Sequence, residues 1–554
     1  MRNRFVFLLP CYLFFALLNA QIDLAALVEE FKNSDRGPYL DIQWFCADGT
    51  VRDPREGCDT IDYRNKQHAR YRGDVQRLGR QQHLFLGQIL TPTSYPAFWD
   101  EVENHSRLKQ YQMGKYLADV DDGWVLRKAQ YYRGALQIED EMQWGRDFFL
   151  WLLRKDDVLK ENFYVVRQAV KDIPHREDTD LTRSIRSISK QIADRFPPFM
   201  KLRAKIHNEP EGKDAATVAA FARANRKELK EKELLPLLDQ LQLEIESAYV
   251  SGDIVAEVAD LLNQLSETSP LRTTVGSFTQ YHTYQPASPA VIDRLTAAAE
   301  LMLIIRNNIE VEKPADQLTL LDISLALERL IFQSASQWEP NSPRELSEKI
   351  CYLSTAAAGV GFVESWEYGA ASPLLGDMNY QYVWPVTLED YLDNARRFVE
   401  WGTSTNRAAY GEVVEQYGAF EPLAYGFLDD RIRSSVLLPL GNAVGQLGNW
   451  VATKGNLNNA LLDVPNQVQV RGLNPGYAKG VLRVIENPTE EFEVNQEDIY
   501  VFAIPPADLK PVGGIASVSE GNMVSHVQLL ARNLGIPNTV ITNAQFKRLR
   551  RYDG

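Results

Sequence analysis

The sequence pattern changes near residue 465, and this change constrains the fold more than any other feature. Upstream, apolar residues recur at helical spacing, as in Leu234, Leu238 and Leu241. Downstream, short β-branched runs are separated by Pro, Gly and Asn, which is typical of strands with tight connections. The sequence therefore predicts a multidomain protein, in which a large mainly α-helical region precedes a small α/β domain at residues 466–554.

The helical region contains a clear helix start and one candidate division. Ser342 is followed by a proline and then by Glu345, which is the pattern of a capping box with proline at the first helical position. A stretch near 268–290 contains Pro, Thr and Ser, which favour a break between helices. We therefore expect two helical lobes, at 21–275 and 276–460.

Aromatic-rich stretches occur within this region, for example YLDIQWF at residues 39–45. Such side chains could stack on sugars or other flat ligands, or they could fill the cores between helices. The second interpretation is favoured, since the sequence does not show exposure.

The first 20 residues have the pattern of a signal peptide. Arg2 and Arg4 precede an apolar run at residues 5–18, and Ala20 supplies a small residue at a cleavage position. The run is short for a membrane span. We expect residues 1–20 to direct export to a periplasm or to the medium, with an uncleaved membrane anchor as the alternative.

Export would place the cysteines in an oxidising compartment, where disulfides persist. Cys46 and Cys58 bracket a polar loop of 11 residues, so we expect a disulfide between them and a buried thiol at Cys351. The loop has carboxylates like those of a calcium site but lacks the required spacing and the closing glutamate. The chain has no Cys-x-x-Cys pair, and no metal site is predicted.

The charge balance argues against one class of partner. The chain has a formal net charge of −14 at pH 7. A protein of this charge has no extended basic field to attract phosphates, so nucleic acid is not an expected partner.

The chain has only seven histidines, and one of them, His526, lies at the start of a predicted helix in the C-terminal domain. It belongs to the stretch EGNMVSHVQLLARNLGIPN, which follows a predicted strand. Gly521 and Asn522 suit a turn, and Ser525 lies at the position of a helix cap. Gly535 then ends the helix.

This position suits phosphate chemistry. A helix N-terminus offers unpaired N–H groups and a partial positive charge, which together favour a phosphate. The same charge disfavours protonation of an imidazole, and a neutral imidazole is a nucleophile toward phosphorus. His526 is therefore a candidate for covalent phosphoryl transfer.

The stretch resembles the mobile phosphohistidine (swivelling) domain of phosphoenolpyruvate-utilising dikinases, a family that includes phosphoenolpyruvate synthase, pyruvate phosphate dikinase and glucan water dikinase. The residues that match the family motif in order and spacing are Gly521, Ser525, His526, Ala531, Arg532, Gly535, Ile536 and Pro537. The upstream segment YAKGVLRVIENPTE resembles the entry strand of the domain. The resemblance implies that His526 carries the phosphoryl group and that Gly521, Asn522, Ser525 and Arg532 surround the phosphate.

The sequence departs from the family pattern at three positions. Asn522 replaces a glycine, Val524 replaces a threonine, and Gln528 replaces a small residue. None of these changes removes the nucleophile. Val524 does exclude the threonine-based phosphorylation that regulates some plant relatives.

The parts that would charge the histidine are not recognisable in this sequence. The resemblance implies ATP and Mg²⁺ as cofactors, bound by an ATP-grasp domain, but residues 21–460 contain no phosphate-cradling glycine loop with its lysine. The sequence ends at RRYDG, where the family domain would continue with further strands. We expect the C-terminal domain to be incomplete here and an ATP-grasp domain to act in cis or in trans.

Two interpretations of function follow. In the first, the protein is a phosphoryl-transfer component of a dikinase-type enzyme, and the acceptor is pyruvate, a glycan or another small molecule. In the second, it is an exported helical binding or scaffold protein with a non-catalytic mobile domain. The intact Ser525–His526 pair favours the first, and the signal-type N-terminus favours the second, because little ATP is present outside the cytoplasm.

Overall fold

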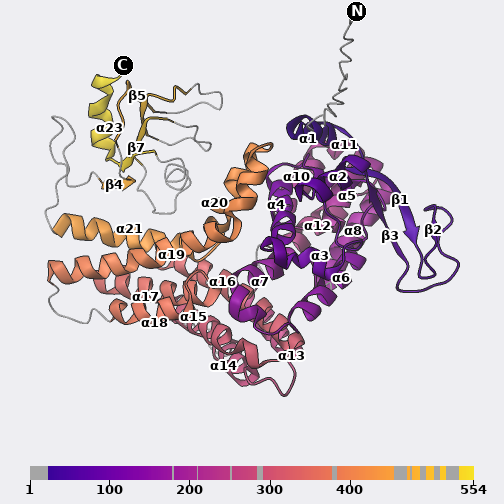
Figure 1. Cartoon of the computed structure of the whole chain (residues 1–554), viewed down its shortest axis with the longest axis horizontal. Coiled ribbons are helices and arrows are strands. Elements are labelled where there is room, and N and C mark those ends of the chain that lie inside the picture. The colour runs from indigo at the N-terminus through magenta and orange to yellow at the C-terminus, as the bar shows by residue number, and fades with distance from the viewer. Residues whose placement is uncertain are drawn as a thin grey trace, which may run out of the picture.

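The structure is a computed structural model of the chain. It describes residues 23–176, 180–208, 210–249, 253–283, 291–376, 384–454, 471–474, 477–486, 494–503, 512–518 and 536–554. The predicted signal segment, 1–20, lies outside the described residues. Figure 1 shows a large helical body followed by a small sheet-containing region at the C-terminus. The prediction of a mainly helical protein with a small C-terminal sheet is confirmed at this level.

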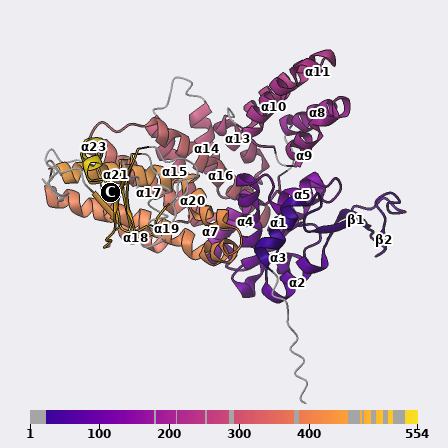
Figure 2. The same ribbon diagram turned by 90° about the horizontal axis from the view of Figure 1, so that it is seen from above.

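The N-terminal part of the helical body includes a short sheet, which lies at the edge of the molecule in Figure 1 and Figure 2. Its helices are α1 (Leu24–Asn33), α2 (Gly73–Gln82), α3 (Tyr95–Trp99), α4 (Ser106–Val120), α5 (Val125–Tyr131), α6 (Ile138–Leu152) and α7 (Val158–Asp172). The sheet has strands β1 (Tyr39–Phe45), β2 (Val51–Arg52) and β3 (Lys66–Tyr71), in the order β2-β1-β3 with antiparallel pairing.

This sheet lies within residues 21–460, where a mainly helical region was expected and no strand was predicted. The stretch YLDIQWF is strand β1, and Tyr39 and Ile42 lie in a small core with Ala69 of β3. Aromatic and β-branched side chains fit a half-buried pleated surface, which explains the strand. Cys46 directly follows β1 and forms a disulfide with Cys58, across a Cα–Cα distance of 5.7 Å.

A second group of helices follows. They are α8 (Asp180–Arg195), α9 (Met200–Asn208), α10 (Lys213–Ala224), α11 (Arg226–Glu231) and α12 (Leu235–Tyr249). These helices have a core of their own, to which the predicted stripe of Leu234, Leu238 and Leu241 contributes. Figure 2 shows α8, α10 and α11 projecting from the rest of the body.

The remaining helices complete the body. They are α13 (Ile254–Gln264), α14 (Arg272–Thr283), α15 (Val291–Asn308), α16 (Pro314–Gln337), α17 (Pro343–Val360), α18 (Ser365–Ala371), α19 (Pro385–Gly418), α20 (Phe427–Arg433) and α21 (Leu437–Lys454). The short 3-10 helices of the body are η1 (Glu101–Glu103), η2 (Pro197–Phe199), η3 (Ile309–Val311), η4 (Ser372–Leu375) and η5 (Pro422–Gly426). The predicted start of α17 is confirmed, because the Ser342 hydroxyl accepts a hydrogen bond from the Glu345 N–H at 3.2 Å.

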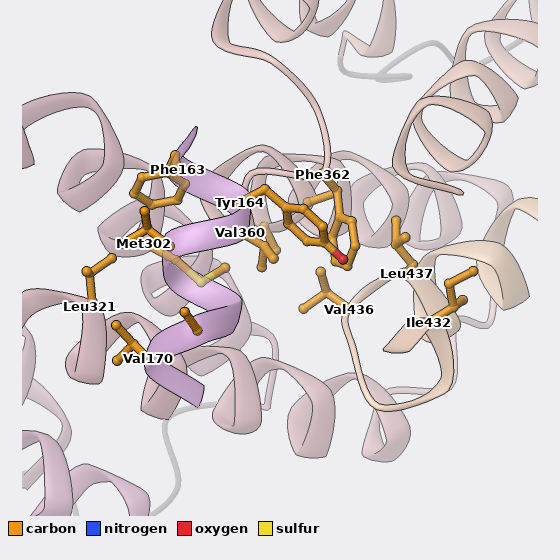
Figure 3. Close-up of a cluster of buried hydrophobic side chains, with 14 of the residues drawn as sticks. Phe163, Tyr164, Val170, Met302, Leu321, Val360, Phe362, Ile432, Val436 and Leu437 are labelled. Carbon is orange, nitrogen blue, oxygen red and sulfur yellow. The ribbon is translucent and has the colours of Figure 1, made fainter. Parts of the chain in front are cut away.

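One large core joins most of these helices. Most residues of α16 are buried, which is typical of a helix enclosed on all sides. Figure 3 shows α7 packed between neighbouring elements, with Phe163 and Tyr164 directed toward residues such as Met302 and Phe362. Buried residues on both sides of position 275 belong to this core, and α14 crosses that position. Another core lies at α8–α12. The division into lobes at 21–275 and 276–460 stays a prediction.

The C-terminal region is an α/β module. Its strands are β4 (Arg471–Asn474), β5 (Leu482–Ile485), β6 (Ile499–Phe502), β7 (Gly514–Ser517) and β8 (Asn538–Val540), and its helices are α23 (Asn543–Leu549) and η6 (Arg550–Tyr552). The sheet order is β4-β8-β7-β6-β5. Neighbouring strands from β5 to β8 are parallel, and β4 is antiparallel to β8.

Candidate functional site

The parallel strands of the C-terminal module end together at one edge. Ile485 is opposite Phe502, Phe502 is opposite Ser517, and Ser517 is opposite Val540. The hydrogen-bond ladder continues one residue further, where Val518 N–H donates to the Phe502 carbonyl at 3.0 Å. In open parallel sheets, ligands bind outside the carboxyl ends of the strands. This edge is therefore the natural place for a site in the module.

The motif segment connects β7 to β8. Residues 519–535 lie outside the described residues, and with them Gly521, Asn522, Ser525, His526 and Arg532. The described residues on either side of this segment are nevertheless placed in the sheet. Ser517 ends β7 at the carboxyl edge, and Asn538 begins β8 at the opposite end of the sheet.

The last two residues of the motif are described, and they are fixed to the sheet. Ile536 is buried in the core that contains Tyr500 and Phe502. The Ile536 carbonyl accepts a hydrogen bond from the Asn474 amide at 2.7 Å, and the Pro537 carbonyl accepts one from Ile515 N–H at 2.9 Å. The Ile-Pro end of the motif thus serves to anchor the start of β8.

The sheet that holds these ends is packed on both faces. Tyr500, Phe502 and Ile515 belong to one apolar cluster, whereas the alternate residues Val501 and Ala516 belong to another. The second cluster includes residues of α23, which therefore covers that face. Alternation of this kind is expected for strands buried on both sides, and it gives the carboxyl edge a rigid support.

One charged pair of the module lies near the amino ends of its strands, whereas another, Arg550 with Glu486, lies just after the carboxyl end of β5. Arg483 of β5 donates to the Asp498 carboxylate at 3.0 Å, and Asp498 is buried just before β6. The hydrogen bond to Asp498 raises the pKa of Arg483. The Arg483–Asp498 pair connects β5 to β6 away from the carboxyl edge, so it is structural.

The other six histidines lie in the helical body, and their contacts are structural where the structure shows them. They are His68, His83, His105, His175, His207 and His282. The ring of His175 is buried between the Ile173 carbonyl, at 2.8 Å, and the Asp322 carboxylate, at 3.2 Å, so both nitrogens are occupied. Burial lowers the pKa of His105, whose ring contacts the Trp99 carbonyl at 3.0 Å.

The body also contains buried charges that periodicity alone does not reveal. Arg167 on α7 is fully buried, and its guanidinium donates to Glu328 at 2.8 Å and to the Ser324 hydroxyl at 2.9 Å, both on α16. Glu328 also accepts a hydrogen bond from Val436 N–H at 3.3 Å. Each charge has its partner, so these residues connect helices and offer no open group to a substrate.

The residues that the structure describes show neither a cluster of metal ligands nor a membrane-spanning helix. Within the described ranges, no group of three or more His, Cys, Asp or Glu side chains is placed to hold a metal ion. Among the helices that the structure describes, none has both the length and the apolar composition to cross a membrane.

Comparison of the chain with models of known families, with curated proteins and with solved structures finds no significant match. The resemblance to the phosphohistidine domain therefore depends on the motif residues themselves. The strand order and the β7–β8 location of the motif are independent structural observations.

Proposed function

We propose that the C-terminal module is a phosphoryl carrier that acts through His526, as a component of a phosphoenolpyruvate synthase-like or dikinase-like enzyme. The observation that supports this most strongly is the run of residues from Gly521 to Pro537, which follows the family motif in order and spacing. The structure adds that this run begins just after the carboxyl end of β7.

The β7–β8 connection favours a phosphate site near His526. Two neighbouring parallel strands need a connection that runs back from the end of one strand to the start of the next. Such a crossover usually contains a helix. A helix at the predicted 526–534 would start at the carboxyl edge, with its N-terminal N–H groups available to a phosphate. His526 would then lie in the first turn of that helix, where the positive end favours a neutral imidazole.

The proposed reaction has two displacements at phosphorus. A ring nitrogen of His526 attacks a phosphoanhydride of ATP, so that a P–N bond forms while the bond from phosphorus to the leaving phosphate oxygen breaks. An oxygen of the acceptor then displaces the imidazole and breaks the P–N bond. Arg532 and the Ser525 hydroxyl are the proposed contacts to the phosphoryl oxygens. Mg²⁺, bound with ATP on an ATP-grasp domain, would neutralise the phosphate charge.

The decisive experiment is site mapping of the phosphoryl group. The protein at residues 21–554 is incubated with ATP, Mg²⁺ and a separately purified ATP-grasp domain, and peptides are analysed at alkaline pH because phosphohistidine is labile in acid. We expect phosphorylation of His526 only, and none in the His526→Ala variant. His83→Asn, which changes a histidine of the body, should be phosphorylated like the wild type, and Arg532→Ala should be phosphorylated less.

A second experiment, the phosphoramidate arm, tests His526 without a partner domain. Phosphoramidate phosphorylates reactive neutral imidazoles without an enzyme, and His526 should react faster than the six histidines of the body. Phosphorylation that survives His526→Ala, or slower reaction at His526 than at His175, would contradict the proposal. Robust ATP hydrolysis by the 21–554 protein alone would contradict the assignment of ATP binding to a separate domain.

The alternative is an exported helical binding protein whose C-terminal module is not catalytic. The signal-type N-terminus favours it. An ATP-grasp domain encoded after residue 554 would favour the enzyme, whereas unreactive His526 in the phosphoramidate arm would favour the binding protein.

A further inference from the structure

The helical body contains a cavity of about 610 Å³ that the motif analysis does not involve. It lies between the C-terminal end of α16, the start of α17 and the face of α21. Cavities of this size are typical of small-molecule sites. The described lining combines apolar and polar side chains with a single buried cation.

The cation is Lys349 of α17, of which 8% is exposed. Its ammonium donates to the Ala335 carbonyl at 2.8 Å and to the Trp338 carbonyl at 2.6 Å, which are backbone acceptors at the end of α16. Burial lowers the pKa of Lys349, and the charge of Glu339 partly opposes this effect. An ammonium has three donors, so one remains for a ligand.

The rest of the lining suits an apolar ligand body. Phe332, Leu346 and Leu438 contribute from α16, α17 and α21. Asn442, Gln446 and Trp450 follow at intervals of four residues on α21, so they lie on one face of that helix at the cavity. Trp450 is 38% exposed and offers its ring to a flat partner.

The charges of the cavity favour an anion over a cation. Lys349 and Glu339 are the titratable side chains of the described lining, and Glu339 is exposed whereas Lys349 is buried. A buried charge interacts more strongly than one in water, because the surroundings screen it less. A carboxylate at Lys349 would add a direct ion pair to a charge that now meets two backbone carbonyls, the ring of Trp338, 5.9 Å away, and the charge of exposed Glu339.

We propose that this cavity binds a small organic carboxylate with a flat apolar body, whose carboxylate pairs with Lys349 and whose body packs between Leu346 and the α21 face of Asn442 and Trp450. The described lining of the cavity contains no residue of the C-terminal module. The function of this site does not depend on phosphoryl transfer by His526.

The test uses calorimetric titration of the full chain with 1-naphthaleneacetate as the probe and with neutral 1-naphthaleneethanol as its matched analogue. We expect saturable binding of the acid at one site and at least tenfold weaker binding of the alcohol. Lys349→Met should weaken acid binding at least tenfold. Asn442→Trp, which fills the cavity from an exposed position, should abolish binding without disturbing the core.

Lys109→Met is the matched control, because Lys109 is also buried, with 3% of its surface exposed, but does not line the cavity. It should bind the acid like the wild type. Equal affinity for acid and alcohol, unchanged binding in Asn442→Trp, or no binding of the acid to the wild type would each overturn the proposal. Thermal unfolding of each variant, which should stay cooperative, separates loss of the site from loss of the fold.

Discussion

Arg431 of α20 and Asp172, the last residue of α7, form a two-pronged ion pair, with 3.2 Å between Arg431 Nη1 and Asp172 Oδ1 and a second contact from Nη2 to Oδ2. Gln112 also donates to Asp172, at 2.7 Å. Burial alone would lower the pKa of Arg431, but the charge and hydrogen bond of Asp172, together with Tyr410 and Tyr164, hold that pKa above its ordinary value. A carboxylate at the negative end of a helix is unfavourable, and Arg431 offsets it.

Asp172→Ala should therefore destabilise the helical body strongly. The substitution leaves the Arg431 charge buried without its counter-ion, and breaking a buried pair in this way costs about 3–5 kcal/mol. The exposed pair of Arg396 and Asp393, 3.1 Å apart, is the matched control, and Asp393→Ala should cost no more than about 1 kcal/mol. Denaturant unfolding of both variants measures the difference. Equal losses would mean that the buried pair contributes no more than a surface pair.

Two helical glycines should respond to alanine with opposite signs. A Cβ at Gly145 of α6 would lie 2.0 Å from the Pro174 carbonyl, whereas a Cβ at Gly369 of α18 would have nothing within 4 Å. Alanine normally stabilises a helix relative to glycine by about 0.5–1 kcal/mol, so Gly369→Ala should raise the free energy of unfolding. Gly145→Ala should lower it by about 1–3 kcal/mol, because a backbone carbonyl must move. Stabilisation by Gly145→Ala would show that α6 can shift away from Pro174 without cost.

The Cys46–Cys58 disulfide should protect its loop from proteolysis and have little effect on the stability of the helical body. No residue of the loop at 46–65 is buried, so its opening does not require unfolding of the main core. Loss of a disulfide that closes a short loop typically costs about 2–4 kcal/mol, and here we assign that cost to local opening. In the Cys46→Ser, Cys58→Ser double variant, trypsin should cleave faster at Arg52 and Arg55, with a nearly unchanged thermal midpoint. Cys351→Ser is the control, and unchanged cleavage in the double variant would contradict the expectation.

Local patterns were sufficient to predict the helical body and the strands of the C-terminal module. The runs VLRVI, DIYVFAI, GGIASVS and NTVIT contain β5, β6, β7 and β8, because β-branched residues between turn residues determine strands locally. The sheet of β1–β3 was missed. Its partner strands are separated by the disulfide loop, and β3 is the polar run KQHARY, so its pairing is set by tertiary contacts that periodicity does not show.

One part of the candidate site could likewise be predicted from the sequence, and another part could not. His526 and its neighbours were recognised from the motif, which is local in the sequence. The position of β7 between β6 and β8 is known only from the strand order of the fold, which no local pattern encodes. The cavity could not have been predicted, because Lys349 and Asn442 come from different helices that meet only in the fold. One signal for buried charges exists, since Arg167 lies in the apolar run YVVRQAV of α7.

The pH dependence of stability should report the buried lysines. Burial lowers the pKa of Lys349 to about 8, and that of Lys109 to about 8, from an ordinary value of 10.5. Between about pH 8 and pH 10.5 these lysines are mostly neutral in the folded state and still protonated in the unfolded state. Because the unfolded state then binds more protons, their contribution makes the free energy of unfolding rise with pH in this window.

Lys349→Met and Lys109→Met should each remove part of this rise, and the double variant should remove both parts. Buried tyrosines act in the opposite direction at the top of the window, for example Tyr71, whose pKa burial raises to about 12, so each variant is compared with the wild type at the same pH. The measurement is urea unfolding at intervals from pH 7 to pH 10. The contrary result is a double variant that keeps the wild-type slope of unfolding free energy against pH. That result would mean that both ammonium groups are hydrated in the folded protein, and that the charge of Lys349 at the cavity wall is not desolvated.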